Sequence, residues 1–178
     1  MKRVAAAALA ALAVGTAAQA EVTDVAAHGF RSSHTLQVAA PPKKVWDALL
    51  QPGRWWDPAH TYSGRAQNLT LEAKAGGCFC ETLKDGYVRH MEVGHIRWPE
   101  QLTLTGALGP LAAEGVAGNM VFTVKPSGGG SVLTMSYAVG GWSAMPFDKL
   151  APAVDGVLAI QMGRLKRHAE TGRPDALK

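Results

Sequence analysis

The chain lacks any apolar run long enough to cross a membrane as a helix. Its clearest apolar run, residues 4–14, contains only Val, Ala and Leu and is far shorter than the roughly 20 residues that a spanning helix needs. Cysteine is also scarce, because Cys78 and Cys80 are the only two in the sequence. This scarcity excludes a zinc site built from four cysteines.

Positive charge is not concentrated on one stripe. Two of the four formal net charges come from Lys2 and Arg3, and the one basic cluster, residues 164–168, contains Arg164, Lys166, Arg167 and His168. This cluster lies near the end of a predicted helix, where cations complement the helix dipole, so we expect it to be solvated. Without a basic patch and a readable motif, we predict no nucleic-acid partner.

Motifs that would identify a catalytic or cofactor site are missing as well. The sequence contains no nucleophile elbow and no recognisable Ser–His–Asp pattern. The glycines at 128–130 have no helix after them to complete a phosphate site. We therefore predict no cofactor and no metal, and the sequence leaves open whether the protein is an enzyme.

The N-terminus has the pattern of a secretory signal. Lys2 and Arg3 precede the apolar run, and residues 18–20, Ala-Gln-Ala, place small residues at the positions that a signal peptidase reads. We predict cleavage after Ala20 and a periplasmic or secreted product. Membrane contact would then be transient, through the signal peptide alone.

The rest of the sequence predicts one domain over residues 28–172, with a loose lead-in at 21–27 and a tail at 173–178. Alternation and turn residues indicate strands, with two short helical segments after the first of them. We expect a loop over one end of the sheet at 107–117. The strands are predicted at 28–38, 66–75, 77–83, 88–98, 102–106, 118–125 and 132–139, and the short helical segments at 43–50 and 54–58.

The last predicted element is a long helix that carries one apolar stripe. Leu150, Val154, Leu158 and Met162 recur at helical spacing. Asp148 is expected to cap the helix, and Gly172 to end it. Only the sheet is large enough to bury this stripe. The order of elements predicts an α+β fold, in which a curved antiparallel sheet of about seven strands wraps on the long helix and two short helices close one end.

Four local segments carry a family resemblance: AAPPKKVWDAL at 39–49, WW at 55–56, GGCF at 76–79 and GGSVLT at 129–134. In this order and spacing they resemble the START-like helix-grip superfamily (SRPBCC), in particular its polyketide cyclase/dehydrase and heat-shock-ATPase-activator-homologue branches. The resemblance covers about residues 30–170 and implies a deep, largely apolar cavity for a small hydrophobic molecule. The export signal departs from the chaperone-cofactor branch, which needs a cytosolic partner.

Cys78 and Cys80 lie two residues apart on a predicted strand, so their side chains share a face. At a rise of ~3.3 Å per residue they would lie about 6.6 Å apart, farther than the Cβ separation of a relaxed disulfide. We therefore favour a role in lining the core or the cavity. A bridged or redox pair and a metal site remain alternatives, the latter only with His60, His90 or His95.

On the predicted strand at 88–98, His90 and Glu92 share one face, and Met91 and Val93 share the other. We expect the first pair to be solvated on the outside of the sheet. The alternative is an inward His90–Glu92 acid/base pair.

Aromatic and apolar residues provide the candidate cavity walls, since ligand pockets are mostly apolar. The adjacent tryptophans follow the first helix, where the family fold has its cavity mouth. The candidates are Trp55, Trp56, Cys78, Cys80, Phe122, Met135, Tyr137, Leu158 and Met162.

The preferred function is an exported domain that binds a small hydrophobic molecule. One alternative is a cyclase, dehydratase or hydrolase that acts in the same cavity. Another is an envelope protein that contacts partners through residues 107–117. The sequence predicts neither the ligand nor the oligomeric state.

Overall fold

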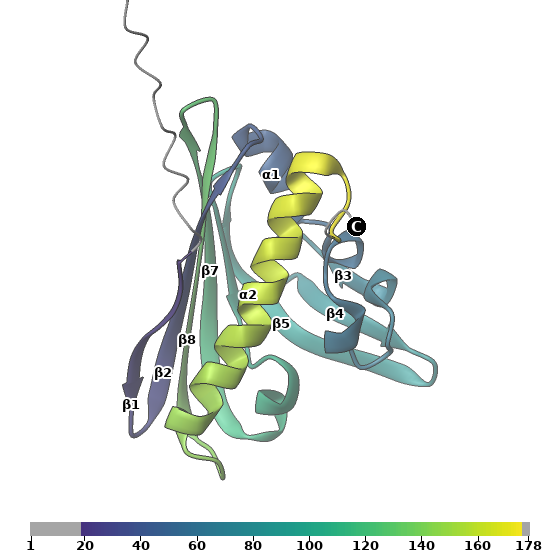
Figure 1. Cartoon of the computed structure of the whole chain (residues 1–178). Coiled ribbons are helices and arrows are strands. Elements are labelled where there is room, and N and C mark those ends of the chain that lie inside the picture. Colours follow the sequence, from purple (N-terminus) through teal and green to yellow (C-terminus); the bar gives the residue numbers. More distant parts are fainter. Residues whose placement is uncertain (1–18, 176–178) are drawn as a thin grey trace, which may run out of the picture.

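A single antiparallel sheet forms most of the molecule, of which the computed structural model describes residues 19–175. Its eight strands follow the order β1-β2-β8-β7-β6-β5-β4-β3, so β2 and β8, far apart in sequence, are neighbours (Figure 1). The strands are β1 (Gln19–Ala26), β2 (Gly29–Val38), β3 (Leu69–Leu71), β4 (Cys78–Leu83), β5 (Gly86–Arg97), β6 (Gln101–Thr105), β7 (Gly115–Ser127) and β8 (Gly130–Trp142).

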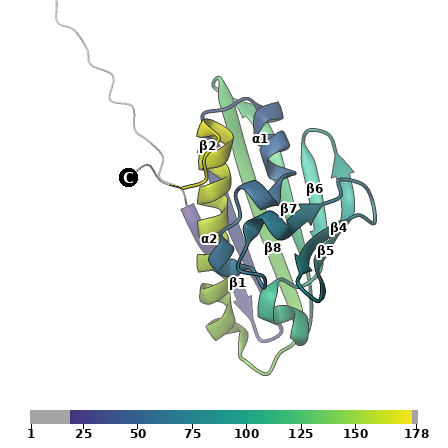
Figure 2. The ribbon, with the colours of Figure 1, turned by 90° about the vertical axis from the view of Figure 1, so that its right-hand side faces the viewer.

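One long helix crosses the concave side of this sheet, and the shorter helical segments lie beside it (Figure 2). The two α-helices are α1 (Pro42–Leu49) and α2 (Phe147–Thr171), and the 3-10 segments are η1 (Pro52–Arg54), η2 (Pro58–His60), η3 (Ala66–Asn68) and η4 (Gly109–Ala113). The predicted helix-grip arrangement is therefore confirmed. The eighth strand, β1, is the addition to the predicted set.

Helix α1 forms where proline stops β2. Pro42 occupies the start of the helix, where a missing N–H costs nothing. The apolar residues of α1 then fall on one face, and the residues buried there are Val45, Trp46, Ala48 and Leu49. This buried face packs α1 against the sheet, and residues 50–56 continue directly from the end of the helix.

Helix α2 buries one stripe and ends as the sequence predicts, at Gly172, whose φ of 79° is left-handed. Its start differs from the prediction, because Pro146 holds the N-cap position and Asp148 lies inside the first turn without capping it. The buried residues of α2 are Phe147, Ala151, Leu158, Gln161, Met162, Leu165 and Ala169.

Two segments differ from the sequence prediction. Residues 21–27, expected to be a loose lead-in, instead supply most of β1, which pairs antiparallel with β2. Only residues 69–71 of the strand expected at 66–75 are extended, because Ala66–Asn68 forms a 3-10 turn. The loop expected at 107–117 contains η4, whose Leu111 is buried, so its central part packs on the core.

Within residues 19–175, no helix has the length and apolarity needed to cross a bilayer. The predicted signal peptide falls almost wholly on residues 1–18, outside the described part of the chain. Its predicted cleavage point, after Ala20, directly follows the first two residues of β1.

Candidate functional site

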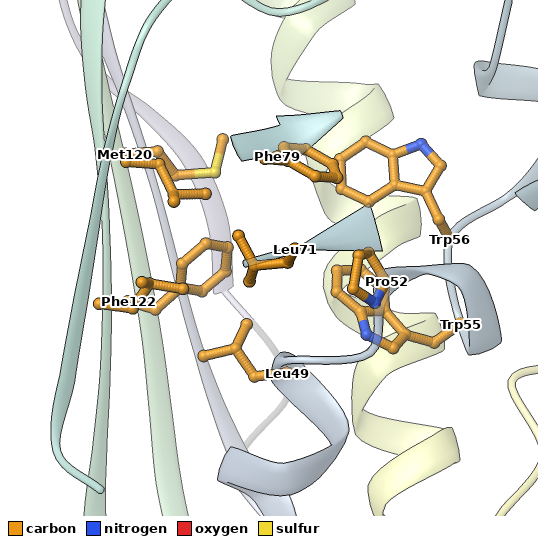
Figure 3. Close-up of a pocket in the computed structure, with 10 residues that line it drawn as sticks. Leu49, Pro52, Trp55, Trp56, Leu71, Phe79, Met120 and Phe122 are labelled. Atoms are coloured by element: carbon orange, nitrogen blue, oxygen red, sulfur yellow. The ribbon is translucent and has the colours of Figure 1, made fainter. Parts of the chain in front are cut away.

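An apolar pocket lies between the sheet and the segment that follows α1 (Figure 3). Leu49 and Pro52 approach it from the α1 side, and Met120 and Phe122 from β7 on the opposite side (Figure 3). Every lining residue is apolar. The full lining consists of Leu49, Pro52, Trp55, Trp56, Leu71, Phe79, Leu102, Leu104, Met120 and Phe122.

The pocket is small in this structure. Its volume open to a water-sized molecule is about 20 Å³, whereas pockets that enclose a drug-sized ligand span about 300–1,000 Å³. Large side chains fill the rest of the space: Trp56 meets Phe79 edge to face, with ring centroids 5.5 Å apart. The deep cavity implied by the resemblance is therefore closed here, and a ligand would have to displace these rings.

Hydrogen bonds to backbone carbonyls fix the indole rings of Trp55 and Trp56. Trp55 Nε1 donates to the carbonyl of Ala48 at 2.9 Å, and Trp56 Nε1 donates to that of His60 at 3.0 Å. Arg164 Nε on α2 donates to the Trp55 carbonyl at 2.8 Å. The expectation that Arg164 is solvated is thus wrong, since its side chain is 13% exposed and clamps this segment to α2.

Gln161, also on α2, makes a second set of hydrogen bonds to the same segment. Its Oε1 accepts a hydrogen bond from the backbone N–H of Asp57 at 2.8 Å, and its Nε2 lies 3.2 Å from His60 Nδ1. A glutamine buried on an apolar stripe must find such partners. The wall that contains Trp55 and Trp56 is therefore attached to α2 on both sides of the pair.

The structure places the nine predicted cavity residues in three groups. Trp55, Trp56 and Phe122 line the pocket. Met135, Tyr137, Leu158 and Met162 belong to the buried core instead. The remaining two are Cys78 and Cys80.

Tyr137 is fixed by its own hydroxyl group. The hydroxyl donates to the Gly106 carbonyl at 3.3 Å and accepts from the Leu108 N–H at 3.2 Å. Burial raises the pKa of Tyr137 to about 12, although the Leu108 hydrogen bond opposes this. A neutral phenol with two hydrogen bonds holds residues 106–108 on the core, so its hydroxyl has little capacity left to bind a ligand.

Cys78 and Cys80 form a disulfide on the outer face of β4. They do not line the pocket, because Phe79 between them points inward while both cysteines lie on the other face. The separation predicted for a regular strand is too long: the two Cα atoms are 5.3 Å apart, within the usual range for disulfides. The pairing of β4 with β5 shifts register between Phe79 and Cys80, so the strand is irregular here.

That register shift also determines the position of His90. Phe79 pairs with Met91 and Cys80 pairs with Arg89, which leaves His90 as the extra residue of a β-bulge on β5. His90 and Met91 are consequently both buried. The prediction that His90 is solvated beside Glu92 is wrong, while Glu92 is exposed and pairs with Arg89 at 3.2 Å.

The inward partner of His90 is Glu81 on β4. His90 Nε2 lies 3.0 Å from Glu81 Oε2, and the Glu81 side chain is fully buried. The backbone N–H groups of Tyr62 and Ser63 donate to the same carboxylate at 3.1 and 2.6 Å. A buried carboxylate needs this number of donors to remain charged.

Both partners have pKa values below their ordinary range. Burial lowers the pKa of His90, and the hydrogen bond and charge of Glu81 only partly offset it. Burial by itself would raise the pKa of Glu81, but the hydrogen bonds from Ser63, Tyr62 and His90 outweigh it. At neutral pH the pair is therefore a neutral imidazole held by a carboxylate.

A second buried histidine lies between β2 and α2. His34 Nε2 is 3.0 Å from Asp155 Oδ1 and 3.1 Å from Ser32 Oγ, and Ser32 Oγ donates to Asp155 at 2.5 Å. This cluster was not predicted from the sequence. Its geometry differs from a catalytic triad, in which the serine and the aspartate contact opposite ring nitrogens; here both contact Nε2.

Burial also lowers the pKa of His34, against the charge and hydrogen bond of Asp155. Within residues 19–175 no cluster of three or more His, Cys, Asp or Glu side chains is placed to hold a metal ion.

A family described as polyketide cyclase / dehydrase and lipid transport matches residues 29–170. The chain belongs to this family. The match covers β2 to α2 and leaves out β1, so it contains the pocket, both buried histidines and the disulfide. The family description names both enzymes and carriers, and one fold can host both kinds of function.

Solved structures share this fold at low sequence identity. The solution structure of CalU16 from Micromonospora echinospora is 15% identical with a TM-score of 0.60, covering 93% of this chain and 81% of that one. A conserved protein of unknown function from Enterococcus faecalis is 17% identical with a TM-score of 0.58, covering 90% and 80%.

The Aha1 dimer from Colwellia psychrerythraea is 13% identical with a TM-score of 0.55, covering 80% of this chain and 97% of that one. No curated protein matches the chain by sequence. These likenesses establish the fold alone.

Proposed function

We propose that this protein is an exported domain that binds a small hydrophobic molecule between the sheet and the α1–η1 segment. The observation that carries the proposal is the lining of the pocket, which consists of ten apolar side chains. Burying an apolar ligand there gains about 25 cal/mol per Å² of surface removed from water. The family description, which includes lipid transport, supports the same function.

Binding requires the wall at Trp55 and Trp56 to move away from β7. Its tethers to α2 are the Arg164 and Gln161 hydrogen bonds, each worth about 0.5–1.5 kcal/mol net. An apolar ligand that gains more than this on burial can open the wall. Binding of such a ligand would then widen the pocket.

Native mass spectrometry of the full chain, expressed with residues 1–20 and recovered from the periplasm, tests both halves of the proposal. We expect a mass that corresponds to cleavage after Ala20, with an additional mass that denaturation removes. A full-length mass in the cytosolic fraction would contradict export. A mature mass without additional mass would show that no molecule stays bound through purification, and the dye experiment then decides whether the pocket binds apolar molecules.

The probe experiment measures fluorescence of N-phenyl-1-naphthylamine, a neutral apolar dye, with a variant that fills the pocket. Leu71 lines the pocket from the short edge strand β3 and is only partly buried, so L71W adds bulk where the fold tolerates it. We expect L71W to weaken dye binding at least severalfold. The control, I160W, changes an exposed residue of α2 outside the pocket, and equal binding by both variants would place the dye elsewhere.

A second candidate function is an enzyme of the cyclase or dehydratase class acting in the same pocket. The buried His90–Glu81 pair favours it, because a neutral histidine oriented by a carboxylate is a competent general base. Chemical analysis of any molecule recovered with the wild-type protein and with H90Q would separate the two. A carrier returns the same molecule from both proteins, whereas an enzyme returns product from one and substrate from the other.

A further inference from the structure

We propose that His90 Nδ1 accepts a hydrogen bond from the bound molecule, so that the site selects an apolar body that ends in one neutral hydroxyl group and rejects a carboxylate. This inference rests on the proposed function and names the class of ligand for the same pocket. Alkyl phenols and long-chain alcohols belong to this class.

The protonation of His90 follows from its partner. Nε2 is 3.0 Å from a carboxylate oxygen of Glu81, and Glu81 offers only lone pairs when ionised. Nε2 must therefore carry the proton. In a neutral imidazole this leaves Nδ1 with a lone pair, which is a hydrogen-bond acceptor.

Nδ1 has no hydrogen-bond partner among the described residues, although the His90 side chain is 92% buried. Nδ1 also remains accessible from outside. Within residues 19–175 the fully buried side-chain nitrogen and oxygen atoms without a hydrogen-bond partner are Trp46 Nε1 and His168 Nδ1, and His90 Nδ1 is not among them. An acceptor in this position, mostly buried but still reachable, is satisfied by water or by a ligand hydroxyl.

Aromatic rings connect this acceptor to the pocket. The ring of Phe79, which lines the pocket, lies 5.2 Å from the ring of His90. Tyr62 lies 5.9 Å from His90, and its side chain is more than half exposed. His90 thus lies between a pocket wall and a surface ring, one ring away from the apolar lining. A ligand whose body displaces the pocket rings can extend its polar end past Phe79 to Nδ1.

The charge of Glu81 sets the preference for a neutral group. The carboxylate is fully buried and ionised behind His90, and two charges interact strongly where the effective dielectric constant is low. The charged residues that flank His90 on β5, Arg89 and Glu92, are exposed and pair with each other. A ligand carboxylate at Nδ1 would face a lone pair and a buried anion with no compensating cation.

Three probes with the same apolar body test the proposal: hexylbenzene, 4-hexylphenol and 4-hexylbenzoate. Their dissociation constants are measured at pH 7.5 by displacement of N-phenyl-1-naphthylamine. In the wild type the benzoate should bind weakest. In H90F the advantage of the phenol over hexylbenzene should fall roughly three- to tenfold, which corresponds to one hydrogen bond. H95F, an exposed histidine on the same strand, is the matched control and should leave this advantage unchanged.

H90F also removes a donor from Glu81, so a second variant separates the two effects. H90Q retains an N–H donor for Glu81 and offers its amide oxygen as an acceptor, so it should keep more of the phenol preference than H90F does.

The outcomes separate this inference from the proposed function. If neither the dye nor any of the three probes binds, the pocket does not bind apolar molecules and the proposed function fails. If all three bind and the phenol preference is the same in wild type, H90F and H90Q, the pocket binds ligands but His90 does not select them. A benzoate that binds as tightly as the phenol at pH 7.5 would overturn the selection against anions.

Discussion

Two buried histidines, His34 and His90, each lie about 3.0 Å from a carboxylate, yet they differ in what their pairs connect. His34 lies on β2, and its partner Asp155 lies on α2, so the first pair joins the sheet to the helix across the core. His90 and Glu81 lie on neighbouring strands of the same sheet, and their further contacts are the 62–63 backbone and the ring of Phe79.

The comparison shows how the same chemical pair serves different purposes. Around His34, Ser32 and Asp155 contact the same ring nitrogen, and the cluster joins the sheet to α2 through buried polar contacts. Around His90, a carboxylate with no exposure holds Nε2, and the imidazole ring lies 5.2 Å from the pocket-lining ring of Phe79. We therefore expect changes at the first pair to affect stability alone, and changes at the second to affect both stability and ligand choice.

The largest effect should follow from E81A. This substitution leaves the N–H groups of Tyr62 and Ser63 and the Nε2–H of His90 without an acceptor in a buried place. Each buried donor left without an acceptor costs about 1–3 kcal/mol, and three donors are involved, so the free energy of unfolding in urea should fall by about 3 kcal/mol or more. A loss below about 1 kcal/mol would show that water replaces the carboxylate easily and that the site is not closed.

D155A should cost less, about 1–2 kcal/mol in the same urea titration. Asp155 is 15% exposed, so water can reach the space it leaves, and Ser32 Oγ remains as a partner for His34 Nε2. Dye binding should remain at the wild-type level. A change in dye affinity as large as that of L71W would show that the β2–α2 cluster controls the pocket and would remove the distinction between the two histidines.

The sequence predicts the scaffold well because the scaffold depends on local patterns. The apolar stripe of α2, the hairpin at Ser127–Gly130 and the alternation along β2 are each contained in a few consecutive residues. The alternation even places Ser32 and His34 on the inner face of the sheet. Their partner Asp155 is more than a hundred positions away, and no pattern in one sequence joins residues so distant.

The errors on β5 have a more specific cause. Counting alternate residues assumes a regular strand, and β5 contains two bulges. The second bulge includes Gly94, a residue that often marks such a site. The first has no glycine and places His90 on the inner face. One extra residue that the sequence does not signal thus places the polar part of the candidate site on the inner face, against the prediction from alternation.

Lowering the pH should reduce the stability that both histidine–carboxylate pairs contribute, and the loss should grow as the pH falls. The pKa values of His34, His90 and His168 are lowered in the folded protein, so the unfolded chain binds more protons once the pH falls below the unfolded value of about 6.5. Stability contributed by these groups is present above that pH and is lost below it, by at most about 1.4 kcal/mol per pH unit for each histidine.

Urea unfolding between pH 7.5 and 5.5 measures this loss. H90Q and H34Q should each flatten the pH dependence relative to wild type, whereas H95F, which changes an exposed histidine, should leave it as it is. Glu81 adds a further loss only below its unfolded pKa of about 4.5, because its folded pKa is lowered too. Stability that stays constant from pH 7.5 to 5.5 would contradict the burial of the imidazoles.

The smallest effect should come from the disulfide. Cys78 and Cys80 enclose one residue, and the entropy that a cross-link removes from the unfolded chain is least for so short a loop. We expect the double variant C78S/C80S to lose about 1 kcal/mol of unfolding free energy. Both cysteines lie on the outer face of β4, opposite Phe79 and Glu81, so the phenol preference should stay within about twofold of wild type. A preference that disappears in the double variant would show that ligand selection needs β4 held rigid around Phe79, and the contrast between the two histidines would then depend on the disulfide as well as on their partners.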